Sequence, residues 1–339
     1  MKRLKVLLIA GVLITSMAGC ASKGGNIDIV ADSEQESGAD QEAGAENAEN
    51  NSDDAGSVEA YEALIAGEGT VSFKYCIDNM DKESEVFSYE DEILSHLSAD
   101  KEYTLPELKS ALNEIFANEE NGFMPGEINS MEYAYLDCGA DGVKELALRM
   151  RGPFVEENSS MTYVIKEIDS KLQVVYAFAG WWRNNTEINE FGYITGGGSN
   201  GASNHGWDAG YVNADGKYSY GFYEEVEADI EMYASYTDHD DFTLPTSEGL
   251  LCVYTLYMGD NQDETYYSYA VNDGEKFEEM DIPNLYTDSE YKDVMDCFKG
   301  QTFITMDELR KLEEDRLQEM GVTDQIKNGK ELNYQEINF

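Results

Sequence analysis

The sequence predicts an α+β domain at residues 58–339, in which an antiparallel, tyrosine-rich β-meander has helices at the N- and C-terminal ends of the domain. Three observations predict this fold class. Nine short runs in the middle of the chain are rich in Tyr, Val, Ile and Phe, which favour strands. Short turns connect several of these runs, and short turns join antiparallel neighbours. Runs with helical spacing and capping residues flank the strand-rich part on both sides.

Two helices are expected before the strands. The first covers residues 58–66, and we expect Ser57 to cap its N-terminus. The second covers residues 105–118, where Thr104 and Glu107 form a capping box and a proline occupies the first turn. Side chains three or four positions apart form the apolar face of this helix. They are Leu108, Leu112, Ile115 and Phe116.

Nine strands are expected next. All are short and rich in β-branched and aromatic side chains. Three of the connections, at residues 213–216, 259–263 and 272–274, combine Asn or Asp with Gly, as hairpin turns do. The expected strands are residues 131–136, 145–150, 161–168, 172–179, 191–195, 210–212, 218–223, 250–258 and 264–271.

Two further helices are expected after the strands. They cover residues 290–298 and 306–320. The second begins with Thr305 and Glu308, which form another capping box. Helices and strands that occupy separate parts of a sequence are typical of α+β domains, in which helices pack on one face or end of an antiparallel sheet.

The first twenty residues have the three-part composition of a bacterial secretion signal. Residues 2–5 carry three positive charges, and residues 6–14 form an unbroken apolar core. This core has about half the length of a membrane-spanning helix, so we expect it to be removed rather than to stay as an anchor. The following residues, Met17-Ala18-Gly19-Cys20, resemble the lipobox of bacterial lipoproteins, with Met17 in the place that leucine usually holds.

The lipobox resemblance implies a lipid-anchored protein. Residues 1–19 would be removed as the signal peptide, and Cys20 would receive a diacylglycerol and become the new N-terminus, with palmitate among the expected acyl chains. Two acyl chains are sufficient for stable anchoring. We therefore expect the membrane as a partner through the lipid on Cys20, and display on the extracytoplasmic face of the cell membrane. An ordinary cleaved signal followed by a chance cysteine is the alternative.

Residues 20–57 are expected to form a disordered acidic tether behind the lipidated cysteine. Residues 21–57 contain no aromatic side chain and few large apolar ones, so they cannot bury enough surface to offset the entropy of ordering. The whole chain has 69 Asp and Glu against 23 Lys and Arg, a formal net charge of −46. Nucleic acid is therefore excluded as an expected partner, because phosphates are bound by basic side chains.

The folded part is similar to a group of uncharacterised acidic lipoproteins from gut clostridia. The similarity rests on a helix, the pattern Asp-x-Gly-x-Asp-Gly-x-x-Glu-Leu at residues 137–146 between two strands, and the tyrosine-rich meander that follows. It covers most of residues 58–339. The resemblance implies an extracellular lipoprotein and brings no particular activity with it.

The same segment resembles the calcium loops of EF-hand and integrin-type repeats. Asp137, Asp141 and Glu145 would be the metal ligands, and a glycine allows the sharp turn. Gly139 stands where the third-position ligand belongs, and the bidentate glutamate of the twelfth position is missing. We therefore expect at most weak calcium binding, and no required cofactor. The alternative is a tight turn in which the aspartates bind backbone amides.

Trp181, Trp182 and Trp207 flank a glycine-rich segment. Aromatic faces bind sugar rings by stacking, and Arg183 with its neighbouring asparagines adds polar groups for hydroxyls. We therefore expect these three tryptophans and Arg183 to bind a ligand, with glycan as the expected class. The alternative is that the rings belong to the core or the rim of a tyrosine-rich sheet.

Residues 197–201 match the Gly-x-Ser-x-Gly pattern of hydrolases, with His205 or His239 as a candidate base. That motif needs a strand before it and a helix after it. The residues that follow have no helical period, so a flexible loop is the preferred interpretation and no catalytic residue is assigned. The 69 acidic residues also make any carboxylate pair easy to find by chance.

These observations favour a surface-displayed binding or interaction domain that is not an enzyme, with a glycan or a surface protein as its partner. Two alternatives stay open: a secreted hydrolase that uses carboxylates, and a structural or assembly lipoprotein with a protein partner. The sequence also leaves open whether the four remaining cysteines form disulfides or are buried thiols. These cysteines are Cys76, Cys138, Cys252 and Cys297.

Overall fold

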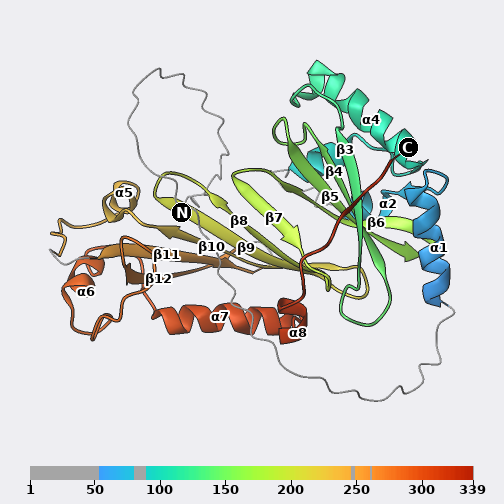
Figure 1. The fold of residues 1–339 in the computed structure, drawn as a ribbon. Coiled ribbons are helices and arrows are strands. Elements are labelled where there is room, and N and C mark those ends of the chain that lie inside the picture. The colour runs from blue at the N-terminus through green and yellow to red at the C-terminus, as the bar shows by residue number, and fades with distance from the viewer. Residues whose placement is uncertain (1–52, 80–88, 246–248, 260–261, 339) are drawn as a thin grey trace, which may run out of the picture. The chain divides into compact units, whose positions relative to one another are not determined.

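A computed structural model describes residues 53–79, 89–245, 249–259 and 262–338. The expected signal peptide, the lipobox with Cys20 and residues 20–52 of the expected tether lie outside these ranges. Within them the chain forms eight α-helices and two sheets in which antiparallel pairing predominates (Figure 1). The predicted α+β class is confirmed. The strands form two sheets, whereas the sequence predicted one meander.

The first sheet has seven strands in the order β13-β3-β4-β5-β6-β1-β2. Four consecutive strands pair as an antiparallel meander, while β1 pairs with β6 in parallel and the C-terminal β13 joins the edge beside β3. The strands are β1 (Val71–Ser72), β2 (Glu102–Tyr103), β3 (Ser130–Leu136), β4 (Glu145–Gly152), β5 (Ser159–Ile168), β6 (Lys171–Gly180) and β13 (Gln335–Glu336).

The second sheet is a six-stranded antiparallel meander in the order β12-β11-β10-β9-β8-β7. Strand β8 extends through residues 196–199, beyond the end of the strand expected at 191–195. Strand β7 was not expected. The strands are β7 (Asn184–Ile188), β8 (Tyr193–Ser199), β9 (Asn204–Val212), β10 (Tyr218–Glu227), β11 (Leu250–Met258) and β12 (Glu264–Asn272).

The helices occur before, between and after the long strands. The first begins at Asp53, so Ser57 lies inside it and the expectation that Ser57 caps the helix was wrong. The helices are α1 (Asp53–Ile65), α2 (Lys74–Asn79), α3 (Tyr89–Ser95), α4 (Leu105–Ala117), α5 (Ile230–Ser235), α6 (Glu290–Met295), α7 (Met306–Glu319) and α8 (Asp324–Lys327), with a short 3₁₀ turn at Glu119–Asn121.

Both predicted capping boxes are present. The Thr104 hydroxyl accepts from the backbone N–H of Glu107, and the Glu107 carboxylate accepts from the backbone N–H of Thr104. Thr305 and Glu308 make the same reciprocal pair at the start of α7. These bonds satisfy amide groups that have no partner inside the helix, which is why α4 and α7 begin where the sequence predicted.

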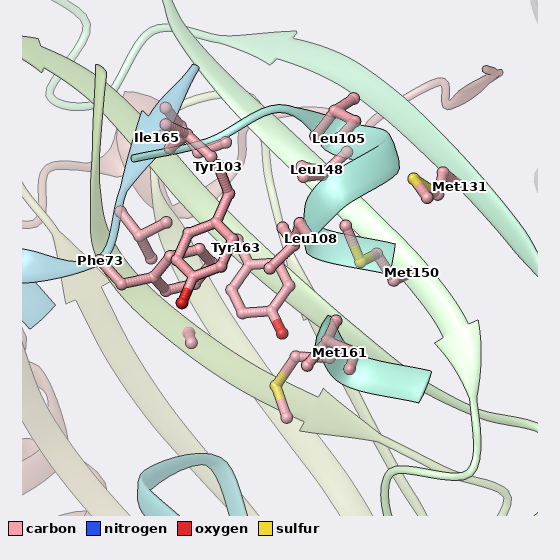
Figure 2. Close-up of a cluster of buried hydrophobic side chains, with 14 of the residues drawn as sticks. Phe73, Tyr103, Leu105, Leu108, Met131, Leu148, Met150, Met161, Tyr163 and Ile165 are labelled. Carbon is pink, nitrogen blue, oxygen red and sulfur yellow. The ribbon is translucent and has the colours of Figure 1, made fainter. Parts of the chain in front are cut away.

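The first sheet and the helices near it enclose the largest apolar core. The predicted apolar face of α4 is buried in it, together with side chains from β3 to β6. Figure 2 shows the rings of Phe73, Tyr103 and Tyr163 packed together in this core. Phe73 meets the other two edge-on, with ring centroids 6.0 Å from Tyr103 and 5.4 Å from Tyr163. These contacts hold β2 and the residue that follows β1 against Tyr163 of β5.

A second core lies between the second sheet and α7, which runs along one face of that sheet (Figure 1). Leu309 and Leu317 of α7 are buried against apolar side chains of β9 to β12. A charged group is buried in the same layer: Arg310 donates hydrogen bonds to Glu224, which is fully buried, and to Glu313. The helix is thus held to the sheet by both apolar and ionic contacts.

The four described cysteines are all free thiols. Cys138 and Cys252 are buried, while Cys76 and Cys297 are half-buried. Burial raises the pKa of Cys76 and of Cys252 to about 12, so both are protonated and poorly nucleophilic at neutral pH. No helix among the described residues is both long and apolar enough to cross a membrane.

Candidate ligand-binding site

A tight turn between the two sheets displays Trp182 and Arg183. The residues on either side, Trp181 and Asn184, exchange two backbone hydrogen bonds of 3.0 Å, so the two displayed residues form the tip of the turn. The Trp182 side chain is 78% exposed, whereas Trp181 is half-buried and packs against the first core. The structure therefore separates the two adjacent tryptophans that the sequence placed in one site.

Trp182 and Arg183 form one wall of an open hollow of about 690 Å³. Strands β7, β8 and β9 and the connection between β8 and β9 provide the rest. Within the sheet, Asn185 pairs with Gly197, and Gly197 pairs with Trp207. We call this feature the tryptophan hollow. Apart from small residues between positions 197 and 206, the side chains that line it are Trp182, Arg183, Asn185, Ser199, His205 and Trp207.

Glycines create the space in the tryptophan hollow. A Cβ atom added at Gly197 would have its nearest neighbour 4.0 Å away, at the Gly206 carbonyl oxygen, so packing does not require glycine at this position. Gly198 is different, because a Cβ atom there would lie 1.9 Å from the Arg183 carbonyl oxygen. Gly198 lets the turn approach the strand, and Gly197 leaves open the surface between the two tryptophans.

The Arg183 side chain is held beside the hollow by two contacts. Its guanidinium lies 5.5 Å from the centre of the Trp182 ring, and one N–H donates to the Ser199 carbonyl oxygen at 3.3 Å. The Arg183 carbonyl oxygen accepts from the Ser199 N–H at 2.9 Å. The arrangement offers flat aromatic surface, amide and hydroxyl groups and a cation, which together suit a polar ring-containing ligand.

The Gly-x-Ser-x-Gly segment does not have the geometry of a nucleophile elbow. Gly197 to Ser199 are the end of β8, and the chain returns as strand β9 rather than as a helix. The expectation of a flexible loop was wrong for this part of the segment. The Ser199 hydroxyl donates to the Gly201 carbonyl oxygen at 2.7 Å. His205 faces Ser199 in the strand register, whereas His239 packs against Phe242 and Phe298.

The loop that resembles calcium-binding loops is closed by its own hydrogen bonds. Oδ1 of Asp137 accepts from the backbone N–H of Asp141 at 2.8 Å and of Gly142 at 3.0 Å. Oδ1 of Asp141 accepts from the N–H of Val143 at 2.9 Å. This is the tight-turn arrangement, in which aspartate side chains satisfy nearby amides.

Glu145, the third proposed metal ligand, is buried and has partners of its own. Its carboxylate accepts from the Cys138 N–H at 2.8 Å and from the Lys166 ammonium at 2.5 Å. Burial raises the pKa of Glu145, and the bond to Lys166 opposes that shift. No group of three or more His, Cys, Asp or Glu side chains placed to hold a metal occurs among the described residues. Calcium binding gains no support and stays a prediction.

The sequence predicted that Trp182, Trp207 and Arg183 belong to one site. It did not predict that His205 and Gly197 line the same hollow. His205 was considered only as a base for Ser199. The signal was present, because strand alternation from Trp207 places His205 on the same face two residues earlier. Using that signal requires knowing that the glycine-rich segment is a strand, and glycine is depleted in strands.

Comparisons of the chain with protein-family models, with curated proteins and with solved structures give no match. The similarity to acidic clostridial lipoproteins therefore stays a prediction. The fold and the tryptophan hollow are the grounds on which function is inferred.

Proposed function

We propose that this domain is a saccharide-binding module displayed outside the cell on a lipid attached to Cys20. The observation that carries the binding proposal is the tryptophan hollow, where Trp182 and Trp207 line a glycine-floored space beside Asn185 and Arg183. Trp182 is 78% exposed, so its ring is accessible to a ligand in the hollow.

The chemistry of the hollow suits a sugar. The apolar face of a pyranose stacks on an aromatic ring, and its hydroxyls need the donors and acceptors that Asn185 and Ser199 provide. The sequence also predicts strands rich in tyrosine. Such strands suit a saccharide-binding surface, because tyrosine combines a flat apolar ring with a polar hydroxyl.

Binding is favoured over carboxylate-dependent hydrolysis at this site. Glycoside hydrolysis uses two carboxyl groups on either side of the scissile bond. The residues that line the tryptophan hollow include no Asp and no Glu. The display part of the proposal rests on the signal sequence and lipobox, and incorporation of labelled palmitate into the full chain tests it.

The binding proposal is tested by retention of the full chain on a panel of immobilised neutral and acidic polysaccharides. We expect retention on at least one of them, and an affinity reduced about tenfold or more when Trp182 and Trp207 are both replaced with alanine, because each ring contributes roughly 1 kcal/mol of stacking. Trp181 is left in place because it packs against the first core and does not line the hollow. Trp207 lines the hollow but also packs against the second core, so Trp182→Ala alone is measured beside the pair, and thermal unfolding checks that both variants are folded.

The matched control is Tyr236→Ala, which removes another exposed aromatic ring that does not line the hollow. This variant should bind as the unchanged protein does. Retention that survives the Trp182→Ala and Trp207→Ala pair would show that the hollow is not the binding site. No retention of the unchanged chain on any polysaccharide would refute saccharide binding and favour a protein partner.

A further inference from the structure

The ionisable groups of the tryptophan hollow are all basic. Arg183 and His205 are the only ionisable side chains among its lining residues. The chain as a whole has 69 Asp and Glu against 23 Lys and Arg, so its acidic side chains outnumber its basic ones threefold. The local charge of the hollow is therefore opposite in sign to the charge of the chain.

Arg183 also differs from the other described arginines. Within the described residues Arg183 makes no ion pair, and one of its N–H groups donates to the Ser199 carbonyl oxygen. A guanidinium has five N–H donors, so donors of Arg183 are left for a ligand. The other four described arginines all form ion pairs: Arg149 with Glu187, Arg151 with Glu132, Arg310 with Glu224 and Glu313, and Arg316 with Glu319.

We propose that the saccharide bound by the tryptophan hollow is acidic: a sugar ring stacks on Trp182 or Trp207, and a carboxylate on that sugar pairs with Arg183. This inference rests on the proposed saccharide-binding function and specifies its ligand class. The planar fork of a guanidinium matches a carboxylate in a two-bond geometry, which a neutral hydroxyl cannot use fully. The cation–π contact with Trp182, 5.5 Å to the ring centre, keeps the guanidinium beside the ring that would receive the sugar.

The net charge of −46 does not prevent the hollow from binding an anionic sugar. At physiological ionic strength, charges separated by more than about 8 Å in solvent are largely screened. The carboxylate of a bound sugar would meet Arg183 within hydrogen-bond distance, and no carboxylate side chain lines the hollow. The Glu156 carboxylate accepts from the backbone N–H of Trp182 at 3.2 Å but does not line the hollow. The acidic surface as a whole slows the approach of an anion, whereas the contact with Arg183 determines how firmly the sugar is held.

The test compares each acidic sugar with its own methyl ester, which keeps the ring and removes the charge. Two probes represent two sources of a sugar carboxylate: trigalacturonic acid for uronic acids and sialyllactose for sialic acids. Calorimetric titration of the full chain should give an affinity for at least one acid that is about tenfold or more above that of its ester. The variant Arg183→Gln should remove this preference, and Arg183→Lys should keep part of it.

Each outcome bears on the proposal. Equal affinity for acid and ester would overturn the acidic ligand and leave saccharide binding intact. Retention of the chain on neutral polysaccharides alone would do the same. A preference for the acid that Arg183→Gln leaves unchanged would overturn the role of Arg183. Binding of no saccharide at all refutes the proposed function itself. Because Arg183 is exposed at the tip of a turn, thermal unfolding should show all three proteins equally folded.

Discussion

Replacing Arg310 with methionine is expected to lower the free energy of unfolding by about 3 kcal/mol. Arg310 donates to the fully buried Glu224 and, at 2.8 Å, to Glu313, and these contacts lie in the apolar layer beneath α7. Without the guanidinium, the negative charge that the Glu224 and Glu313 carboxyl groups share would stay in that layer with no cation. We expect the lower part of the usual range because the Arg310 side chain is itself 38% exposed.

Chemical denaturation of the full chain measures this loss. The variant Lys311→Met is the control, because Lys311 is the next residue of α7 and forms an exposed pair with Asp315. Exposed pairs of this kind contribute at most about 1 kcal/mol. An Arg310→Met variant as stable as Lys311→Met would show that the buried group contributes nothing to the attachment of α7.

The buried cluster of Arg310, Glu224 and Glu313 also makes the free energy of unfolding depend on pH. Burial, and next the hydrogen bond with Glu313, raises the pKa of Glu224 well above its ordinary range. The folded chain therefore keeps a proton that the unfolded chain releases above about pH 4.3. The stability that this proton provides is present below that pH and is lost as pH rises through the raised pKa. Glu224→Gln should flatten this decline, and an unchanged decline would contradict the assignment.

Replacing Phe73 with alanine is expected to lower the free energy of unfolding by about 3–5 kcal/mol. Phe73 is fully buried, and its ring meets Tyr103 and Tyr163 edge-on (Figure 2). Removing it leaves a cavity in the first core beside Tyr103 and Tyr163 and ends two aromatic contacts. Because β1 and β2 have two residues each, few other contacts compensate.

Denaturant unfolding compares Phe73→Ala with Phe73→Leu, which keeps an apolar side chain of moderate size. The leucine variant should lose far less stability than the alanine variant. Leu244→Ala provides a surface control, because Leu244 is an exposed apolar side chain. A Phe73→Ala loss no larger than that of Leu244→Ala would mean that the packing at Phe73 is not tight.

Elements with strong local signals were predicted closely. The capping threonines of α4 and α7 determine where these helices begin, because the amide groups they satisfy belong to the first turn itself. Strand β11 has the predicted bounds, residues 250–258, because its apolar run ends at a turn that the sequence marks clearly. Such features depend on neighbours in the sequence, so the sequence alone reveals them.

Elements that depend on distant partners were missed. The two-residue strands β1 and β2 are strands only because they pair with β6 and with each other. Residues 196–198 are three glycines, which have no strand preference, and they are strand because β7 and β9 pair on both sides. The division into two sheets was missed for the same reason, since the turn at Trp182 and Arg183 resembles any other hairpin turn in sequence.

The candidate site was predicted in part. Clustering of Trp182, Arg183 and Trp207 was inferred from their position beside one glycine-rich segment, and the structure places all three around the tryptophan hollow. Trp181 was grouped with them wrongly, because sequence adjacency does not show that a turn sends neighbouring side chains to different environments. The structure places Trp181 against the first core and Trp182 in solvent.

Filling the tryptophan hollow tests the proposed binding site most directly. Gly197→Ile places a side chain in the open space, where a Cβ atom has no neighbour nearer than 4.0 Å, and isoleucine favours a strand. Thr195→Val on the same strand, outside the hollow, is the matched control. The titrations use whichever of trigalacturonic acid, sialyllactose and the polysaccharides of the retention panel the unchanged chain binds. We expect Thr195→Val to bind that saccharide as the unchanged chain does, and Gly197→Ile to bind it at least tenfold more weakly at undiminished thermal stability. Equal binding by Gly197→Ile, or no binding of any of these saccharides by the three proteins, would contradict a saccharide site in this hollow.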